Sequence, residues 1–396
     1  LPDEAATRRL GEDIAAILQP GDLVLLAGEI GAGKSTLARA LIRAVADDAG
    51  LEVPSPTFTL VQTYPLRFPL AHLDLYRLAE AAELAELGLD EALEAGAALV
   101  EWPERALAAL PADALTIHLE DRGAGRLARI DAPGAWGPRV ARTLALRAFL
   151  DRSGWLGASR RHLQGDASTR AYERVQAPAG GSAVLMNAPP RLPGPPLPGE
   201  VAHRATDVRP FVAMGEALIA AGVSAPALLA ADLSGGMLLL EDLGSEGIVK
   251  DGEPDFERYA LAAELLAELH ARPRPSVLPL PDGSRHVVPP FDEAAFLIEV
   301  DLLPRWYLPL LGRTLSNEAE AAFVAIWKRL FMRFDAAAKS WLLRDFHSPN
   351  LLYLPHRHGT ARIGVLDHQD AMIGAAAYDL ASLGPDVRLT IEPGFE

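Results

Sequence analysis

The sequence predicts an α/β domain in residues 1–150 followed by an α+β domain in residues 151–396. Three observations predict this arrangement. A chain of 396 residues is long enough for two or three domains. Residues 10–150 alternate short apolar runs with helical patterns, as in a mostly parallel sheet with crossover helices. Beyond residue 150, a strand–turn–strand pattern gives way to mainly helical segments.

The elements of the first domain follow from apolar runs bounded by turn residues. The run at 22–27 (DLVLLA) predicts a short buried strand, and the Ala-, Leu- and Arg-rich stretch at 35–46 predicts a helix. The remaining predictions are strands at 58–64, 70–75 and 97–101, helices at 79–95 and 139–150, and a closing hairpin of 114–119 with 126–131.

The second domain follows a linker at 152–158. Its first strands are predicted at 172–175 and 183–186, around a Gly/Pro turn at 178–181. The Pro- and Gly-rich stretch 188–199 cannot lie inside a helix or a central strand, so it predicts a surface loop. The strongest helical patterns are those at 211–221, 256–271 and 318–334.

Composition excludes several kinds of site. The chain has no cysteine, which excludes disulfides, thiolate zinc sites, iron–sulfur clusters and a cysteine nucleophile. A formal charge of −16 argues against a basic surface that grips nucleic acid directly. We find no apolar run of about 18 residues and no signal-peptide pattern, so we expect a cytoplasmic protein that does not associate with membranes.

Residues 28–35 (GEIGAGKS) match the P-loop pattern G-x-x-x-x-G-K-[ST] between a predicted strand and a predicted helix. In such a loop, backbone N–H groups surround the β-phosphate of ATP, the lysine reaches the β/γ-oxygens and the hydroxyl binds Mg²⁺. The predicted ATP and Mg²⁺ site comprises Gly28, Gly31, Ala32, Gly33, Lys34, Ser35 and Thr36. The alternative is a glycine-rich turn without a ligand. A dinucleotide-binding loop is not supported, because G-x-G-x-x-G is absent.

Three further segments occur in a fixed order after this loop: SPTFT at 55–59, HLDLYR at 72–77 and VEWPE at 100–104. With these four motifs, the first 150 residues resemble the bacterial ATPase subunit of tRNA threonylcarbamoyladenosine biosynthesis, the TsaE family. The resemblance implies that Thr57 lies in a nucleotide-sensing loop and that Asp74 helps to hold Mg²⁺. It also implies that Glu101 and Trp102 lie beside the nucleotide and are needed for turnover.

The same resemblance implies a partner for the chain. Members of this family bind a threonylcarbamoyl transferase heterodimer and reset it between turnovers. Because the first half is itself acidic, we expect the partner subunits to hold the tRNA, with this chain contacting tRNA only indirectly.

The residues alone support part of these assignments. Asp74 and Glu101 each stand at the carboxyl end of a predicted strand, where ligands of open α/β sheets bind. One carboxylate could hold Mg²⁺ while the other orients the attacking water, so Glu101 is the candidate catalytic residue. The alternatives are a helix cap for Asp74, a salt-bridged sheet edge for Glu101 and a core position for Trp102.

A second set of polar residues lies in the C-terminal half. Asp345 and Asn350 lie five residues apart in LRDFHSPN (343–350), and Asp367 follows in GVLDHQD (364–370). Phosphoryl transfer needs an aspartate that accepts the hydroxyl proton and side chains that hold Mg²⁺. We predict Asp345 as the catalytic base, with Asn350 and Asp367 as metal ligands. The apolar segment LLLEDLG (238–244) predicts a strand that leads into a hinge.

With these segments, residues 155–385 resemble the aminoglycoside phosphotransferase superfamily, and most closely its kinases of N-acetylmuramate and N-acetylglucosamine. The resemblance implies a bilobal α+β fold of the protein-kinase type and a small amino-sugar acceptor. It places Ser168 in a phosphate-covering loop (GDASTRAY, 165–172) and Glu241 and Leu243 in an adenine-binding hinge.

Four features depart from that family. Leu343 stands where a histidine is usual, Asn187 replaces an expected acidic residue, and no lysine lies between Lys34 and Lys250. The sequence also stops soon after YDL (378–380), so we expect a C-terminally truncated kinase domain. An alternative is a nucleotide-gated adaptor whose C-terminal half is a non-catalytic binding module. A stand-alone kinase that uses the P-loop is less favoured, because no Arg-rich lid follows the loop.

Overall fold

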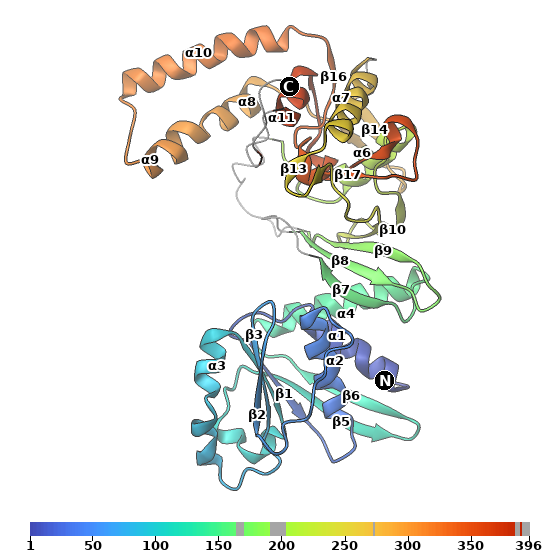
Figure 1. Cartoon of the computed structure of the whole chain (residues 1–396), viewed down its shortest axis with the longest axis vertical. Coiled ribbons are helices and arrows are strands. Elements are labelled where there is room, and N and C mark those ends of the chain that lie inside the picture. Colours follow the sequence, from blue (N-terminus) through green and yellow to red (C-terminus); the bar gives the residue numbers. More distant parts are fainter. Residues whose placement is uncertain (164–169, 191–202, 272–273, 385–388, 390–396) are drawn as a thin grey trace. The chain divides into compact units, whose positions relative to one another are not determined.

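The computed structural model describes residues 1–163, 170–190, 203–271, 274–384 and 389. Contacts divide the chain into two compact units, Leu1–Asn187 and Ala188–Glu396 (Figure 1).

The first unit is built on a six-stranded sheet. In spatial order its strands are β2 (Val61–Pro65), β3 (Pro69–Asp74), β4 (Ala97–Glu101), β1 (Leu23–Ala27), β5 (Leu115–Arg122) and β6 (Gly125–Asp131). The four central strands run parallel, and the two edge strands pair antiparallel with their neighbours. Every residue of β1 and β4 is buried, because helices cover both faces of the sheet. This explains the uninterrupted apolar runs of these strands.

Two apolar cores lie on opposite faces of this sheet. Val24 and Leu26 of β1 face helices α1 (Glu4–Ala15), α2 (Lys34–Ala46) and α4 (Trp136–Arg152). Leu23 and Leu25 face the other core, which includes α3 (Leu89–Ala95). The alternation follows from the two-residue period of a strand.

Two of the differences from the predictions have a clear local cause. The helix predicted at 79–95 is a 3₁₀ segment, η1 (Ala81–Leu87), followed by α3, because Gly88 between them has a left-handed backbone with φ of 69°. The strand predicted from residue 58 begins only at Val61. The preceding residues form a turn in which the Leu60 N–H donates to the carbonyl of Pro56. Further short 3₁₀ turns are η2 (Pro103–Arg105) and η3 (Leu107–Ala109).

The first unit also contains three antiparallel strands, β7 (Ser159–Leu163), β8 (Ala171–Gln176) and β9 (Ser182–Asn187). The predicted hairpin of β8 and β9 is confirmed. Strand β7 was not predicted, because its sequence SRRHL lacks an apolar alternation.

The second unit combines a few short strand pairs with helices. Its helices include α6 (Arg209–Ala220), α7 (Phe256–His270), α8 (Glu293–Val300), α9 (Leu308–Leu310), α10 (Asn317–Asp335) and α11 (Ala377–Leu383). Its strand pairs are β10 (Leu228–Asp232) with β11 (Met237–Glu241), β12 (Val249–Lys250) with β13 (Glu253–Pro254), β14 (Val277–Pro279) with β15 (Arg285–Val287), β16 (Lys339–Leu342) with β19 (Met372–Ala375), and β17 (Leu351–Tyr353) with β18 (Ile363–Val365). The predicted polar motifs lie next to the last two pairs. The motif at 343–350 connects β16 to β17, and the motif at 364–370 runs from β18 towards β19.

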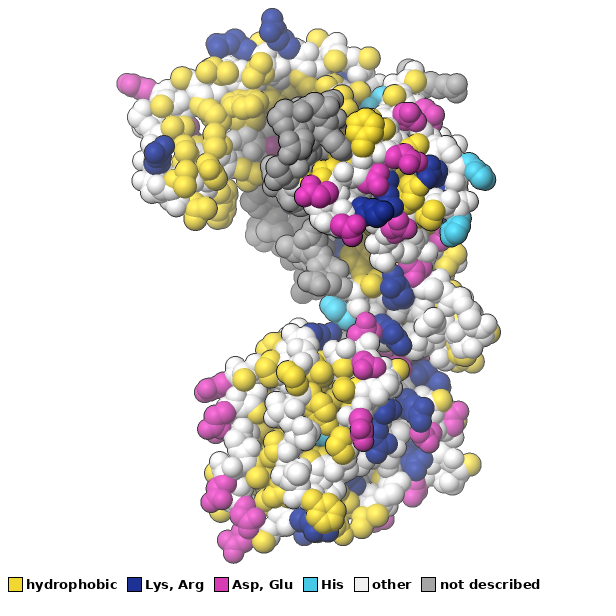
Figure 2. Space-filling model, in the orientation of Figure 1, with side chains coloured by type: hydrophobic (Ala, Val, Ile, Leu, Met, Phe, Trp, Pro, Cys, Tyr) yellow, Lys and Arg dark blue, Asp and Glu magenta, His cyan; other side chains and the backbone are white. Residues whose placement is uncertain are grey.

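Helices α8 to α10 form a helical arm, defined here as residues 293–335 (Figure 1). At its base, Phe296 packs against Phe331 and Trp327. Farther out, apolar side chains remain accessible, among them Trp306 (74% exposed) and Leu310 (80%), and Figure 2 shows hydrophobic atoms along this arm. Across the described chain, we find no helix with both the length and the apolar character needed to span a bilayer.

Candidate active sites

The P-loop predicted from the sequence connects β1 to α2, and its glycines are needed for its shape. Gly28 has φ of 138°, and a Cβ at this position would collide with the carbonyl oxygen of Leu119. Gly33, with φ of 105°, precedes the first residue of α2. An L-residue rarely adopts either conformation. The loop therefore has a shape that this sequence can reach only with glycines, and Thr36 follows it in the first turn of α2.

Lys34 points into the loop. Its Nζ donates to the carbonyl oxygens of Gly28 (2.6 Å) and Glu29 (2.9 Å) and lies 3.5 Å from the centre of the Trp102 ring. Burial lowers the pKa of Lys34, while the negative charges of Glu101 and its neighbours oppose that shift. Neutral carbonyls and an aromatic face compensate only part of the lost hydration of an ammonium group. The ammonium is therefore placed where a polyphosphate would bind it more strongly than its present partners.

Glu101, at the end of β4, connects the P-loop to the neighbouring strand. Its carboxylate accepts a hydrogen bond from the Ser35 hydroxyl (2.9 Å) and lies 3.0 Å from Nε2 of His72. Glu101 and His72 are each 1% exposed. His72 lies within the predicted motif at 72–77, but no role was predicted for it. Its position two residues before Asp74, on the same face of β3, is the signal that could have identified it.

Asp74 and Thr57 lie together at the end of β3. Asp74 Oδ2 accepts hydrogen bonds from the hydroxyls of Thr57 (2.9 Å) and Ser55 (3.2 Å), and Oδ1 accepts from the N–H of Tyr76. No helix begins at this point of the described chain, so the helix-cap alternative is wrong. Asp74 is also the register partner of Glu101 across β3 and β4. Both carboxylates therefore lie at the same edge of the sheet.

Trp102 follows Glu101 in a left-handed conformation, with φ of 60°. Its N–H donates to the carbonyl of Leu26, and its ring lies 4.9 Å from that of Tyr76 and over the Lys34 ammonium. The ring is thus held beside the loop and is not a central core residue.

In the second unit, the predicted catalytic loop connects β16 to β17. Asp345 is followed by Asn350, whose side-chain amide donates to the Asp345 carbonyl (3.0 Å). Burial and the nearby charge of Asp367 raise the pKa of Asp345 to about 6. Asp367 itself has a left-handed backbone, and its Oδ1 accepts a hydrogen bond from the Gln369 amide (2.7 Å). Asp345 and Asn350 lie in this loop, and Asp367 follows β18 close to them, since the N–H of the preceding Leu366 donates to the Asn350 carbonyl (2.9 Å).

Asp379 shapes this loop and was missed as a functional candidate. It is fully buried on α11, and its two oxygens accept the N–H groups of Leu343 and Arg344, each at 2.8 Å. Arg344 has φ of 73°, and its guanidinium donates to Glu299 of α8. A charged acceptor on two successive N–H groups stabilises this strained turn. The motif YDL was visible in the sequence, but its contact with residue 343 was not.

The predicted hinge lies at the end of β11. The Glu241 carboxylate is paired with Arg357 (2.7 Å), so its side chain is engaged within the protein. Leu243 lies against β18, 3.3 Å from where a Cβ on Gly364 would be. Ser168, predicted to cover the phosphates, lies outside the described residues.

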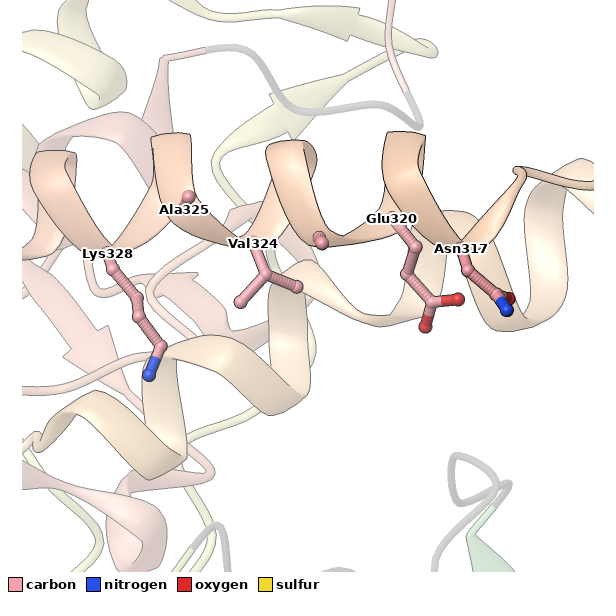
Figure 3. A pocket seen from close by; sticks show the side chains of 6 residues that line it. Asn317, Glu320, Val324, Ala325 and Lys328 are labelled. Atoms are coloured by element: carbon pink, nitrogen blue, oxygen red, sulfur yellow. The ribbon is translucent and has the colours of Figure 1, made fainter.

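The surface of helix α10 contains a groove that includes none of the predicted motifs. The groove is lined by Asn317, Glu320, Val324 and Lys328, which project from one side of the helix in Figure 3. Its charged side chains already form ion pairs, Lys328 with Glu293 of α8 and Glu320 with Arg305 of the π-helical segment η4 (Leu303–Tyr307).

Among the described residues, no three His, Asp or Glu side chains form a ready-made metal cluster. The hard oxygen ligands of Ser35 with Glu101, and of Asn350 with Asp367, suit Mg²⁺ bound together with phosphate and water.

Comparison with known proteins assigns the two parts. The model of the family "Threonylcarbamoyl adenosine biosynthesis protein TsaE" matches residues 1–128, and that of the "Phosphotransferase enzyme family" matches residues 159–395. A TsaE protein of Rickettsia bellii is 38% identical over 30% of this chain and 83% of its own length. An N-acetylmuramate/N-acetylglucosamine kinase of Caulobacter vibrioides is 36% identical over 64% of this chain and 74% of its own length. The chain belongs to both families.

The predicted resemblances and fold class are therefore confirmed: a TsaE-type P-loop part is followed by a phosphotransferase part of the protein-kinase type. Related N-acetylmuramate/N-acetylglucosamine kinases of Pseudomonas putida and Pseudomonas aeruginosa are 34% and 35% identical, and the chain covers 58% of each. Residues 129–158, which contain α4, lie between the two matched segments.

Proposed function

We propose that this chain joins an Mg²⁺-dependent ATPase acting in tRNA N6-threonylcarbamoyladenosine formation to an ATP-dependent amino-sugar kinase. The observation that carries the first activity is the hydrogen bond between Ser35 and Glu101. In P-loop enzymes, a hydroxyl at this position and a strand-end carboxylate together face Mg²⁺. Lys34 would bind the β/γ-phosphates, and a Mg²⁺ ion held by Ser35 and Glu101 would neutralise part of their charge.

Other residues of the first site have roles that follow from their contacts. Glu101 would orient the attacking water and the metal, since Ser35 and His72 fix its two carboxylate oxygens. Asp74 is proposed to couple the metal region to Thr57, since one carboxylate oxygen binds the threonine hydroxyl. Trp102 keeps the lysine in place through its ring face. A threonylcarbamoyl transferase heterodimer is the proposed partner, and tRNA is contacted only through it.

For the second activity, Asp345 is the proposed base that accepts the proton of the sugar hydroxyl. A pKa raised to about 6 keeps this carboxylate ionised at neutral pH while making it a better base than an ordinary aspartate. Asn350 and Asp367 are the proposed Mg²⁺ ligands, and the backbone from Glu241 to Leu243 is the proposed adenine contact. The acceptor class is an N-acetylated amino sugar, as the names of the kinase relatives suggest.

Two variants of the full chain test the proposal. We expect Lys34→Ala to abolish ATP hydrolysis by the P-loop part, measured with the partner heterodimer, and to leave sugar phosphorylation unchanged. Conversely, we expect Asp345→Asn to abolish transfer from labelled ATP to N-acetylmuramate or N-acetylglucosamine and to leave hydrolysis unchanged. Activities that survive both changes would contradict the assignment. Co-purification with the heterodimer, with and without ATP, tests the partner.

A second candidate is an adaptor whose phosphotransferase part binds partners or a sugar without catalysis. Strand β9 favours it, since Met186 is buried there and Asn187 is held by Arg142. No described residue of β7 to β9 supplies a lysine for the α/β-phosphates. ATP binding without transfer to any sugar in the panel would support the adaptor and contradict the kinase.

A further inference from the structure

A cation outside the P-loop motif contacts the outer side of the loop. Arg126, on strand β6, donates from Nε to the carbonyl oxygen of Ala32 (2.6 Å) and from Nη2 to that of Gly31 (3.1 Å). Its guanidinium also lies against Gly33, where a Cβ would be only 3.1 Å from Nε. Gly33 therefore provides the turn and leaves room for this side chain.

The contact fixes the direction of backbone N–H groups. In a trans peptide, the C=O and the following N–H point in opposite directions, and no described peptide is cis. Because Arg126 holds the carbonyls of Gly31 and Ala32, the N–H groups of Ala32 and Gly33 point away from it. The Ala32 N–H donates to the carbonyl of Glu29, which in turn accepts from Lys34. The side opposite Arg126 is thus the interior of the loop.

Two cations consequently hold four carbonyls of one short loop. Lys34 binds Gly28 and Glu29 from inside, and Arg126 binds Gly31 and Ala32 from outside. A triphosphate competes for the inner cation, because it offers stronger acceptors than neutral carbonyls. The outer cation already donates to the backbone, on the side away from the loop interior.

We propose that Arg126 is a positioning residue for the nucleotide. Its guanidinium holds the carbonyls of the Gly31–Ala32 and Ala32–Gly33 peptides, so that the Gly33 N–H faces the phosphates. Arg126 itself does not bind phosphate. The inference rests on the proposed ATP site and deepens it. Because the loop binds the phosphates that ATP and ADP share, replacing Arg126 should weaken the binding of both nucleotides equally.

The test compares variants of the full chain by calorimetric titration with Mg²⁺-ATP and Mg²⁺-ADP, in the Asp345→Asn background. Lys34→Ala identifies the heat that belongs to the P-loop. We expect Arg126→Ala to weaken both nucleotides about tenfold, which corresponds to about 1.4 kcal/mol. Arg126→Lys should recover part of the affinity, because one ammonium can still bind one carbonyl. The matched control is Arg129→Ala on the same strand, whose exposed side chain pairs with Glu120; it should change neither affinity.

The outcomes separate the explanations. If Arg126→Ala loses affinity for ATP but not for ADP, Arg126 contacts the γ-phosphate directly, which would overturn the positioning role. Unchanged affinities with a lowered melting temperature would reduce Arg126 to a structural residue and also overturn it. If the Lys34→Ala variant binds both nucleotides with normal affinity, the proposed ATP site is wrong. If nucleotide affinity falls in Lys34→Ala but is normal in Arg126→Ala, the proposed ATP site is supported and the positioning role of Arg126 is wrong.

Discussion

Replacing Arg160 with methionine should destabilise the first compact unit more than any surface change in it. Arg160, on β7, is 3% exposed and donates to both oxygens of Glu173 (2.6 and 2.7 Å). It also donates to Asp13 of α1 (2.7 Å) and to the hydroxyl of Thr143 on α4 (3.0 Å). Burial lowers the pKa of Arg160, but the two carboxylates outweigh that effect and raise it, so the group stays charged.

The magnitude follows from what the substitution leaves behind. Asp13 would keep its contact with Arg147 (2.7 Å), whereas Glu173 would lose the partner of both its oxygens in a buried position. Removing one partner of a buried ion pair costs about 3–5 kcal/mol. For a unit of this size, each kcal/mol lowers the melting temperature by about 2–4 °C, so we expect a drop of about 10 °C.

Hydrogen exchange read by mass spectrometry, together with a melting curve of the full chain, measures this effect. We expect faster exchange in α1, α4 and β8 and unchanged exchange in α7 and α10. The control is Arg161→Met, because its side chain is 46% exposed and lies 3.7 Å from Asp47. It should change stability by no more than about 0.5 kcal/mol. Adding Glu173→Leu to Arg160→Met should restore most of the loss. If the protein with Arg160→Met alone is as stable as the wild type, the reasoning is refuted.

Three other predictions concern the two sites. Glu101→Gln should lower ATP hydrolysis by about 10²–10⁴-fold, measured over a Mg²⁺ titration, because a neutral amide orients the attacking water and the metal less well than the carboxylate; an unchanged rate would remove Glu101 from the mechanism. Since the pKa of Asp345 is raised to about 6 by burial and nearby acidic groups, sugar phosphorylation should fall below that pH as the base is protonated. Asp370→Asn should move this acidic limb to lower pH, since its charge contributes to the shift; a pH profile that does not move would contradict the cause. Asp379→Asn should destabilise the catalytic loop by about 1.5–3 kcal/mol in urea unfolding, because two N–H groups lose a charged acceptor, and a stable variant would show that the turn holds itself.

The parts that could be predicted from the sequence are those whose residues lie close together along the chain. The P-loop is an eight-residue pattern, and β1 and β4 are apolar runs whose burial follows from a parallel sheet. Arg126 could not be predicted as part of the loop, because it lies 94 residues beyond Ala32 and enters through the β5–β6 pairing. Asp379 lies 36 residues after Leu343, and only the packing of α11 brings them together.

Strand β7 shows why a regular element can be invisible in a sequence. Apolar alternation indicates a strand only where the inward side chains are apolar. Here the inward position is Arg160, whose charge is compensated by Glu173 and Asp13. A buried ion pair therefore replaces the apolar residue that the pattern requires. The partner Asp13 is 147 residues away, so no local reading would have found the compensation.

The same contacts bear on how the two families are joined. Asp13 belongs to the segment matched by the TsaE model, and Arg160 and Glu173 belong to the segment matched by the phosphotransferase model. All three lie in one compact unit and share one buried network. A flexible tether would leave each segment with its own satisfied charges. Here Arg160 donates to a carboxylate from each segment, Glu173 of its own segment and Asp13 of the other. The junction is therefore part of the folded structure, and a change at Asp13 should loosen β8 as well as α1.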